Sequence, residues 1–219
     1  MLKVVIVCIS LRAGGTERVV SRVANHLSST RKVAVVTLAA TDPFYALLPS
    51  VRLVRPAFRS RSCEGLKWYF KLLCYLRKTF DEVKPDLVLC YGEPIAPLVI
   101  PLSRLASARV LVFNRASPIT SLRGIRGLLN PIVYPLAHKV VVQTTASVDL
   151  MRQRYWGCDF FVLPNPVNLP ELVEAISCRE QVVVSVGTLG GKKNQEALIR
   201  AFAALHDAEH WSLDIVEEG

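Results

Sequence analysis

The sequence predicts an α/β protein in which a Rossmann-like parallel sheet flanked by helices is followed by an incomplete second Rossmann-like domain. Short apolar runs rich in β-branched residues alternate with longer helical patterns, and this alternation indicates parallel strands joined by helices. The chain of 219 residues is 51% hydrophobic and 21% charged, a composition that supports a substantial core. A second strand, glycine loop and helix begin near Gln181, and the chain ends two strands into that domain.

The first strand, loop and helix form the unit around which the rest of the sheet is predicted. The apolar run 3–9 leads into a loop containing Gly14 and Gly15, and a helix with one apolar face follows. Paired glycines allow positive φ and close approach to a ligand. Thr16 as the N-cap would turn free N–H groups and the positive dipole end toward an anion or a hydroxyl cluster. A tight turn without a ligand fits the same residues.

The other elements of the first domain follow from apolar periodicity and turn residues. Helical segments containing Pro97, Pro101, Pro131 and Pro135 are expected to be kinked or broken. We expect strands at 32–38, 51–55, 86–90, 108–113, 139–143 and 160–163, and helices at 64–83, 94–105, 124–138 and 147–155.

The domain boundary is predicted from a rigid exit after the seventh strand. Two prolines and two asparagines within residues 164–168 mark the end of the sheet, and a weakly helical acidic segment follows. The predicted domains are residues 1–168 and 181–219, joined by a linker at 169–180. In the second, strands are expected at 181–187 and 211–216, with a helix at 195–205 between them.

A second glycine loop, residues 187–193, lies between that strand and helix. Its glycines allow backbone approach, and Lys193 at the helix start adds a point charge suited to a diphosphate. The stretch is not a Walker P-loop, because Asn194 follows the lysine where Ser or Thr is required. A solvated loop lysine is the alternative interpretation.

Charge is unevenly distributed. The net formal charge is +9, made of +14 in residues 1–170 and −5 in residues 171–219, so the first part favours anionic partners. Basic residues interleaved with aromatic ones across 52–78 suit an anionic membrane surface, although a plain solvated helix face fits equally well. No recognised nucleic-acid motif accompanies them, and no nucleic-acid partner is expected. The membrane-surface candidates are Arg59, Arg61, Lys67, Trp68 and Lys71.

Several other classes of function receive no support. The six cysteines form no Cys-x-x-Cys pair, and Cys8 and Cys90 are predicted to be buried thiols in a reducing compartment. The four histidines show no metal-ligand spacing, so neither a metal nor a cofactor is expected. We expect no signal peptide and no membrane span, since the longest charge-free stretch is only residues 127–138.

Several of these stretches together resemble family 4 retaining glycosyltransferases of the GT-B fold. Each is weak alone, but their order and spacing match across nearly the whole chain. The matching pieces are the Gly-Gly-Thr-Glu-Arg loop at 14–18, Phe113-Asn114-Arg115-Ala116-Ser117-Pro118, Asn165-Pro166, Ser185-Val186-Gly187-Thr188-Leu189, Lys193-Asn194 and Ala201-Phe202.

The resemblance implies two facing Rossmann-like domains, with the acceptor held mostly by the first and a UDP- or GDP-linked sugar by the second. It places the sugar diphosphate near Gly14, Gly15, Thr188 and Lys193. The substrate-side candidates are Glu17, Arg115 and Asn165; Glu17 also suits a helix-dipole role and Arg115 a plain surface position. The catalytic residues stay unassigned.

The sequence departs from the family pattern at three places. Thr188 stands where the family usually has Arg, Glu217 replaces the first glycine of a Gly-x-Gly, and the paired-glutamate motif is not reached. Two hypotheses follow. The first is transfer of a sugar from a nucleotide-sugar to a lipid-linked or polysaccharide acceptor, in the cytoplasm or peripherally on the inner membrane face. The second is a truncated, non-catalytic GT-B fragment that acts as a binding module or has no activity. A dehydrogenase fits poorly without Gly-x-Gly-x-x-Gly.

Overall fold

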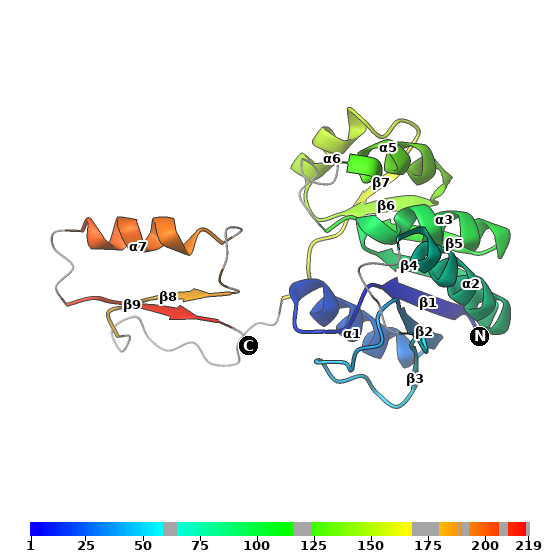
Figure 1. Ribbon diagram of the computed structural model, residues 1–219, viewed down its shortest axis with the longest axis horizontal. Helices are drawn as coiled ribbons and strands as arrows, with labels where there is room; N and C mark the ends of the chain where they lie inside the picture. The colour runs from blue at the N-terminus through cyan, green and yellow to red at the C-terminus, as the bar shows by residue number, and fades with distance from the viewer. Residues whose placement is uncertain are drawn as a thin grey trace. The chain divides into compact units, whose positions relative to one another are not determined.

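The chain folds into two compact units, Met1–Pro166 and Val167–Gly219, each of which is described here by itself (Figure 1). The computed structural model describes residues 1–58, 65–115, 124–167, 180–187, 189, 193–205 and 210–217. The predicted α/β class, with a parallel Rossmann-like sheet, is confirmed.

A seven-stranded sheet with only parallel pairings forms the centre of the first unit, in the order β3-β2-β1-β4-β5-β6-β7. The order reverses between β1 and β4, so their loops diverge at that point. The strands are β1 Lys3–Cys8, β2 Lys32–Thr37, β3 Val51–Val54, β4 Leu87–Tyr91, β5 Arg109–Phe113, β6 Lys139–Val142 and β7 Phe160–Val162.

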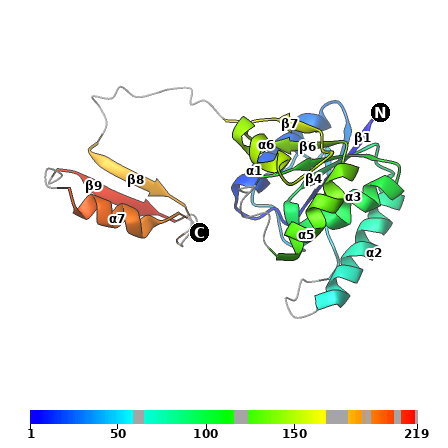
Figure 2. The ribbon, with the colours of Figure 1, turned by 90° about the horizontal axis from the view of Figure 1, so that it is seen from above.

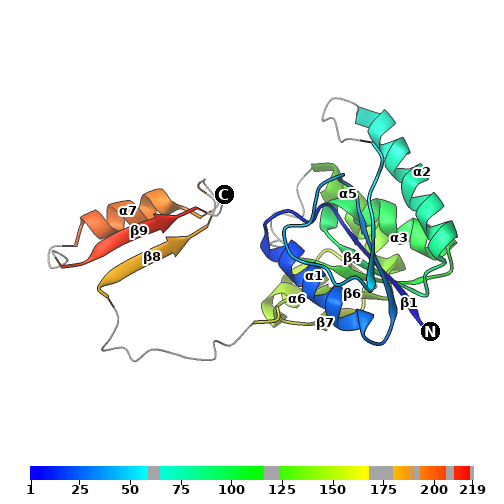
Figure 3. The same cartoon turned by 90° about the horizontal axis from the view of Figure 1, so that it is seen from below.

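Helices cover both faces of this sheet, as parallel strands require. Alternate residues of β1 enter two separate cores: Ile6 packs in the core that contains α1, and Val5 packs in the core that contains α2, α3 and α6. Helices α2 and α3 lie side by side (Figure 2 and Figure 3). The helices are α1 Gly15–Ser28, α2 Gly65–Val83, α3 Ala96–Leu105, α5 Gly124–Val133 and α6 Thr145–Arg152.

The proline-containing helices are broken, as predicted. A 3₁₀ turn, η1 Glu93–Ile95, precedes α3, and a second turn, η2 Tyr134–Leu136, follows α5. Pro101 and Pro131 remain inside α3 and α5. The other predicted elements are present with ends shifted by at most three residues. The predicted weak helix of the linker lies outside the described residues.

The second unit contains two parallel strands and one helix: β8 Val182–Val186, α7 Gln195–Ala203 and β9 Ser212–Val216. Val184 and Val186 on β8 are exposed, so within the described residues this small sheet leaves apolar side chains uncovered. No helix in the described part of the chain is long and apolar enough to cross a membrane.

The centre of the sheet should dominate the stability of the first unit. Ile6 is fully buried and lies opposite Val35 and Leu89 in the two neighbouring strands. We predict that Ile6→Ala lowers the free energy of unfolding by about 2–5 kcal/mol, because it removes buried methyl groups and leaves a cavity. Ile132→Ala at an exposed position of α5 is the control and should change it by less than about 0.5 kcal/mol. Urea unfolding measures both, and equal effects would contradict the prediction.

Candidate functional site

The candidate site of the first unit lies at the carboxyl edge of the seven-stranded sheet. Because all seven strands are parallel, the loops that follow them emerge at this one edge. The loop after β1 carries Gly14, the residue two positions after β5 is Arg115, and Asn165 follows β7. Open α/β sheets bind their ligands at this edge, close to the point where the strand order reverses.

Arg115 and Asn165, both predicted from the sequence, contact each other in the structure. The Arg115 Nη2 donates a hydrogen bond to Asn165 Oδ1 across 50 positions of sequence. Asn165 Nδ2 in turn donates to Gln143 Oε1 at 3.3 Å, at the end of β6. The ends of β5, β6 and β7 are therefore joined by one polar chain. Sequence reasoning missed Gln143, whose only signal was its place as the last residue of a predicted strand.

The guanidinium of Arg115 lies over the ring of Tyr91. Its ring stacks on Phe113 with centroids 4.2 Å apart and 10° between the planes, and the Arg115 guanidinium carbon lies 6.0 Å from the Tyr91 centroid. Partial burial lowers the pKa of Arg115, whereas Tyr91 and Glu17 act in the opposite direction. Burial raises the pKa of Tyr91, so its hydroxyl stays protonated at neutral pH. Tyr91 is the second residue that sequence reasoning missed.

The first glycine loop differs from the prediction at its cap. The N-cap of α1 is Gly14, not Thr16, and the backbone of Gly14 is extended, with φ 169°, so this glycine does not use the left-handed region that it would allow. A Cβ at Gly14 would lie 2.3 Å from Oε2 of Glu17. The Glu17 carboxylate therefore folds back over Gly14 from the third helical position, and a side chain at residue 14 would require that flexible carboxylate to move. Gly15 has open space at the same point.

The Glu17 carboxylate also acts on its surroundings. Burial, followed by the negative charge of Glu17, raises the pKa of the Cys8 thiol to about 12. That thiol donates to the carbonyl of Ser10 at 3.3 Å. Cys8 and Cys90 are buried, as predicted, and burial raises the pKa of Cys90 as well. A buried, protonated thiol is a poor nucleophile, so these residues pack rather than react.

The second glycine loop brings Lys193 against Gly187. Gly187 has φ 151°, its N–H donates to the Val216 carbonyl at 2.9 Å, and a Cβ there would lie 3.3 Å from Lys193 Cε. The lysine stem therefore crosses the glycine, while the residue as a whole is exposed. Thr188, the other predicted contact of a diphosphate, lies outside the described residues.

A carboxylate occupies this second loop as well. Glu217 Oε1 accepts a hydrogen bond from the N–H of Leu189 at 3.1 Å. Gln195 Nε2 donates to the Gly187 carbonyl at 3.4 Å. The N–H of Leu189 is thus already paired, and an anionic ligand would have to exchange with Glu217 to reach it.

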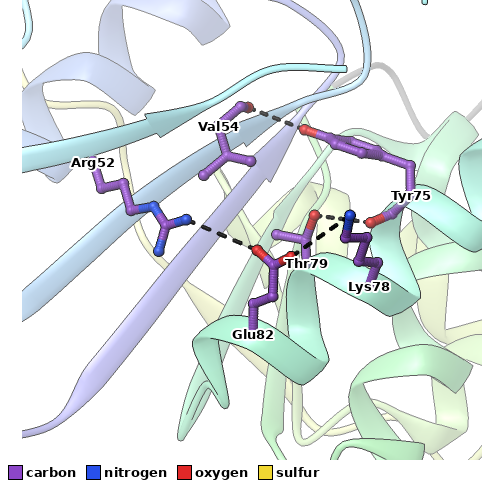
Figure 4. Close-up of polar contacts among 6 residues, drawn as sticks. All are labelled: Arg52, Val54, Tyr75, Lys78, Thr79 and Glu82. Atoms are coloured by element: carbon purple, nitrogen blue, oxygen red, sulfur yellow. Dashed lines mark hydrogen bonds and ion pairs between the residues drawn. The ribbon is translucent and has the colours of Figure 1, made fainter. Parts of the chain in front are cut away.

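Three of the five membrane-surface candidates fall on the first turns of α2. Lys67 and Lys71 are exposed and Trp68 is half-buried, whereas Arg59 and Arg61 lie outside the described residues. The other end of α2 is fixed to β3: the Tyr75 hydroxyl donates to the Val54 carbonyl at 3.1 Å, and Arg52 pairs with Glu82 at 3.9 Å (Figure 4).

The described part of the chain contains no group of three or more His, Cys, Asp or Glu side chains able to hold a metal ion. The site contains hydrogen-bonding side chains, the Arg115 guanidinium over the ring of Tyr91, glycine loops and helix N-termini. These features bind and orient anionic or hydroxyl-rich ligands.

Comparison with solved structures gives the class of fold. A lipopolysaccharide outer core galactosyltransferase, WaaB, matches all of this chain and 62% of its own, with 17% identity and a TM-score of 0.71. A UDP-N-acetylglucosamine 2-epimerase from Rickettsia bellii matches with 12% identity and a TM-score of 0.59, also over all of this chain and 62% of its own. The fold is therefore the one found in GT-B glycosyltransferases, and it is shared with an epimerase.

The sequence comparison narrows this to one family. Residues 13–171 match Glycosyltransferase Family 4, and the chain belongs to that family. An uncharacterized glycosyltransferase of Haemophilus influenzae is 24% identical over 94% of this chain and 59% of its own length. A GalNAc-α-(1→4)-GalNAc-α-(1→3)-diNAcBac-PP-undecaprenol α-1,4-N-acetyl-D-galactosaminyltransferase of Campylobacter jejuni is also 24% identical, over 94% of this chain and 58% of its own length. The chain thus spans just under three fifths of the curated relatives it matches.

The buried Cys8 thiol predicts how stability changes at alkaline pH. Its pKa is raised from 9.0 to about 12 in the folded protein, so only the unfolded chain ionises between these values. Its contribution is complete below pH 9 and is lost as the pH rises toward 12, at about 1.4 kcal/mol per pH unit. From pH 8 to 10.5, the wild type should therefore lose about 2 kcal/mol more unfolding free energy than Cys8→Ala.

Urea unfolding under reducing conditions measures this difference. Cys74→Ala is the matched control, because Cys74 is an exposed thiol. It should lose stability in parallel with the wild type. A parallel loss in Cys8→Ala would show that the Cys8 thiol does not carry the effect.

Proposed function

We propose that the chain is part of a glycosyltransferase that moves a sugar from a UDP- or GDP-linked donor to a lipid-linked or polysaccharide acceptor. The observation that carries the proposal is the polar chain Arg115–Asn165–Gln143 at the carboxyl edge of the sheet, in a chain that belongs to Glycosyltransferase Family 4. The predicted first domain, residues 1–168, serves as the acceptor side. Residues 181–219 belong to the donor side and follow a linker at 169–180.

The roles of the residues follow from their chemistry. Lys193 and the α7 N-terminus stabilise the diphosphate that leaves, while Gly14 and Gly15 allow the sugar diphosphate to approach the backbone. Arg115 and Asn165 orient hydroxyl or anionic groups of the substrate. Two similar proteins support the proposed classes of donor and acceptor. A HepE structure from Anabaena, similar at a TM-score of 0.71 and 15% identity, is a complex with UDP and glucose. The Campylobacter relative is named for an undecaprenol-linked substrate.

We further propose a cytoplasmic location with peripheral contact to an anionic membrane. Lys67 and Lys71 lie beside exposed aromatic residues of α2, and this composition is typical of interfacial helices. Arg59 and Arg61 extend the basic segment in sequence.

The alternative is a binding module without transferase activity. Two observations favour it: Thr188 brings no charge where the family usually has an arginine, and Glu217 places a carboxylate on the second glycine loop. Both weaken a site meant for a diphosphate.

Sugar transfer tests the first proposal directly. Labelled UDP- and GDP-sugars are supplied with lipid-linked and glycan acceptors, and product is measured for the wild type and Arg115→Ala. A charge-assisted contact contributes about 1.5–3 kcal/mol, so the variant should transfer about ten- to a hundredfold more slowly. Arg109→Ala, an exposed arginine at the opposite end of the same strand, should behave as the wild type. Equal rates for Arg115→Ala would refute the assignment of Arg115, and absence of transfer by the whole protein to which the chain is proposed to belong would favour the binding module.

Nucleotide binding tests the second glycine loop by itself. Lys193→Ala should weaken binding of uridine or guanosine diphosphate by about ten- to a hundredfold, because it removes the charge beside Gly187. Thr188→Arg should tighten it by adding a second cation. Lys192→Ala is the control and should matter less. Calorimetric titration gives the constants; if the parent chain binds neither nucleotide and Thr188→Arg gains nothing, the loop is a structural turn.

A further inference from the structure

An apolar cavity lies at the same edge of the sheet, beside the reversal of strand order. Its volume is about 250 Å³. It is bounded by the residues that follow β1 and β2, by the first turns of α2 and by η1 with the start of α3. The residues that define it are Ile9, Leu38, Trp68, Leu72, Ile95 and Leu98. None of these residues belongs to the polar chain of Arg115, so the cavity is a separate subsite.

The rim of this cavity is held by backbone hydrogen bonds. The N–H groups of Leu38 and Ala39 both donate to the carbonyl of Ile9, at 3.1 and 2.9 Å. Leu72 and Ile95 are buried and belong to the core between α2 and α3. The loops after β1 and β2 are therefore tied together, and the cavity is formed without any ligand.

One polar group of the lining has no partner. Trp68 lines the cavity, and its Nε1 is buried without a hydrogen-bond acceptor among the described residues. Buried donors are normally paired. Nε1 itself is closed to solvent, so an occupant of the cavity contacts other atoms of Trp68.

The surroundings of the cavity indicate the charge and setting of that occupant. Tyr69, Phe70 and Leu73 on the same turns of α2 are exposed, at 48%, 66% and 38%. Residues 65–76 include two lysines and no acidic residue. A helix end with exposed aromatic rings and lysines suits the boundary between lipid and water, and its charge complements an anionic head group.

We propose that this cavity holds the first part of the hydrocarbon chain of an anionic lipid acceptor, with its charged head beside the exposed Lys67. The volume is below the ~300–1,000 Å³ of pockets that enclose a whole small molecule, so the cavity takes a segment of the chain and the rest stays in the bilayer. The inference rests on the proposed function only in naming this lipid as the acceptor.

Trp68 itself reports on occupancy. The chain has three tryptophans, and Trp156 and Trp211 are exposed. With Trp156→Phe and Trp211→Phe, the remaining fluorescence comes from Trp68. Titration of this protein with farnesyl phosphate below its micelle concentration should give a saturable shift. Inorganic phosphate should give none, because the chain supplies the contacts.

A filling variant tests the position. Ala39 lines the cavity and is half-buried, so Ala39→Phe should weaken farnesyl phosphate binding at least tenfold. Ala40→Phe is the matched control, because Ala40 is exposed and does not line the cavity; it should bind as the parent does. Equal weakening by both variants, or no saturable shift in the parent, would overturn the proposal.

Two further arms separate the possible sources of the signal. Neutral phosphatidylcholine vesicles should not reproduce the shift; if they do while farnesyl phosphate does not, the cavity binds bilayer lipid and the acceptor assignment is wrong. Transfer to a water-soluble glycan acceptor is measured in parallel. Lipid binding that Ala39→Phe weakens, in a protein that transfers no sugar, would support the cavity and overturn the proposed function.

Discussion

The parallel alignment of seven strands is the constraint on which the rest of the first unit depends. Strands buried on both faces leave little room for polar side chains along their length, so these side chains collect where the strands end. All carboxyl ends meet at one edge, and this brings the loop of Gly14 to the same side as Arg115, Gln143 and Asn165. The reversal of order between β1 and β4 separates the loops there, and the apolar cavity lies beside it.

A carboxylate occupies the glycine loop in each unit. Glu17 lies against Gly14, and Glu217 accepts from the N–H of Leu189. In the first loop an acidic side chain lies close to the backbone N–H groups that would suit an anion. In the second loop an acidic side chain already accepts a hydrogen bond from one of them. A diphosphate must displace these carboxylates or bind beside them, and Lys193 is the cation placed to favour it. The same charge on Glu17 helps to keep Cys8 protonated.

The two ends of helix α2 differ: the second half contacts β3, and the first turns expose aromatic and basic side chains. The second half of the helix is joined to β3 by the hydrogen bond from Tyr75 to the Val54 carbonyl and by the Arg52–Glu82 pair (Figure 4). Leu76 and Phe80 are buried in the same half of the helix. Its first turns instead expose aromatic rings and lysines around the cavity. The second half therefore fixes the position of a surface suited to lipid, without that surface contributing to the core.

The sequence by itself determined the parallel α/β class, the order of the elements and their breaks at proline, because periodicity and missing N–H groups act over a few residues. It also identified the family and the residues Arg115 and Asn165. Only the tertiary structure decided that these two meet through Gln143, that Tyr91 lies under the guanidinium, and that Gly14 rather than Thr16 caps α1. Those contacts depend on which strands become neighbours and on side chains that fold back in space, and neither is expressed in local sequence patterns.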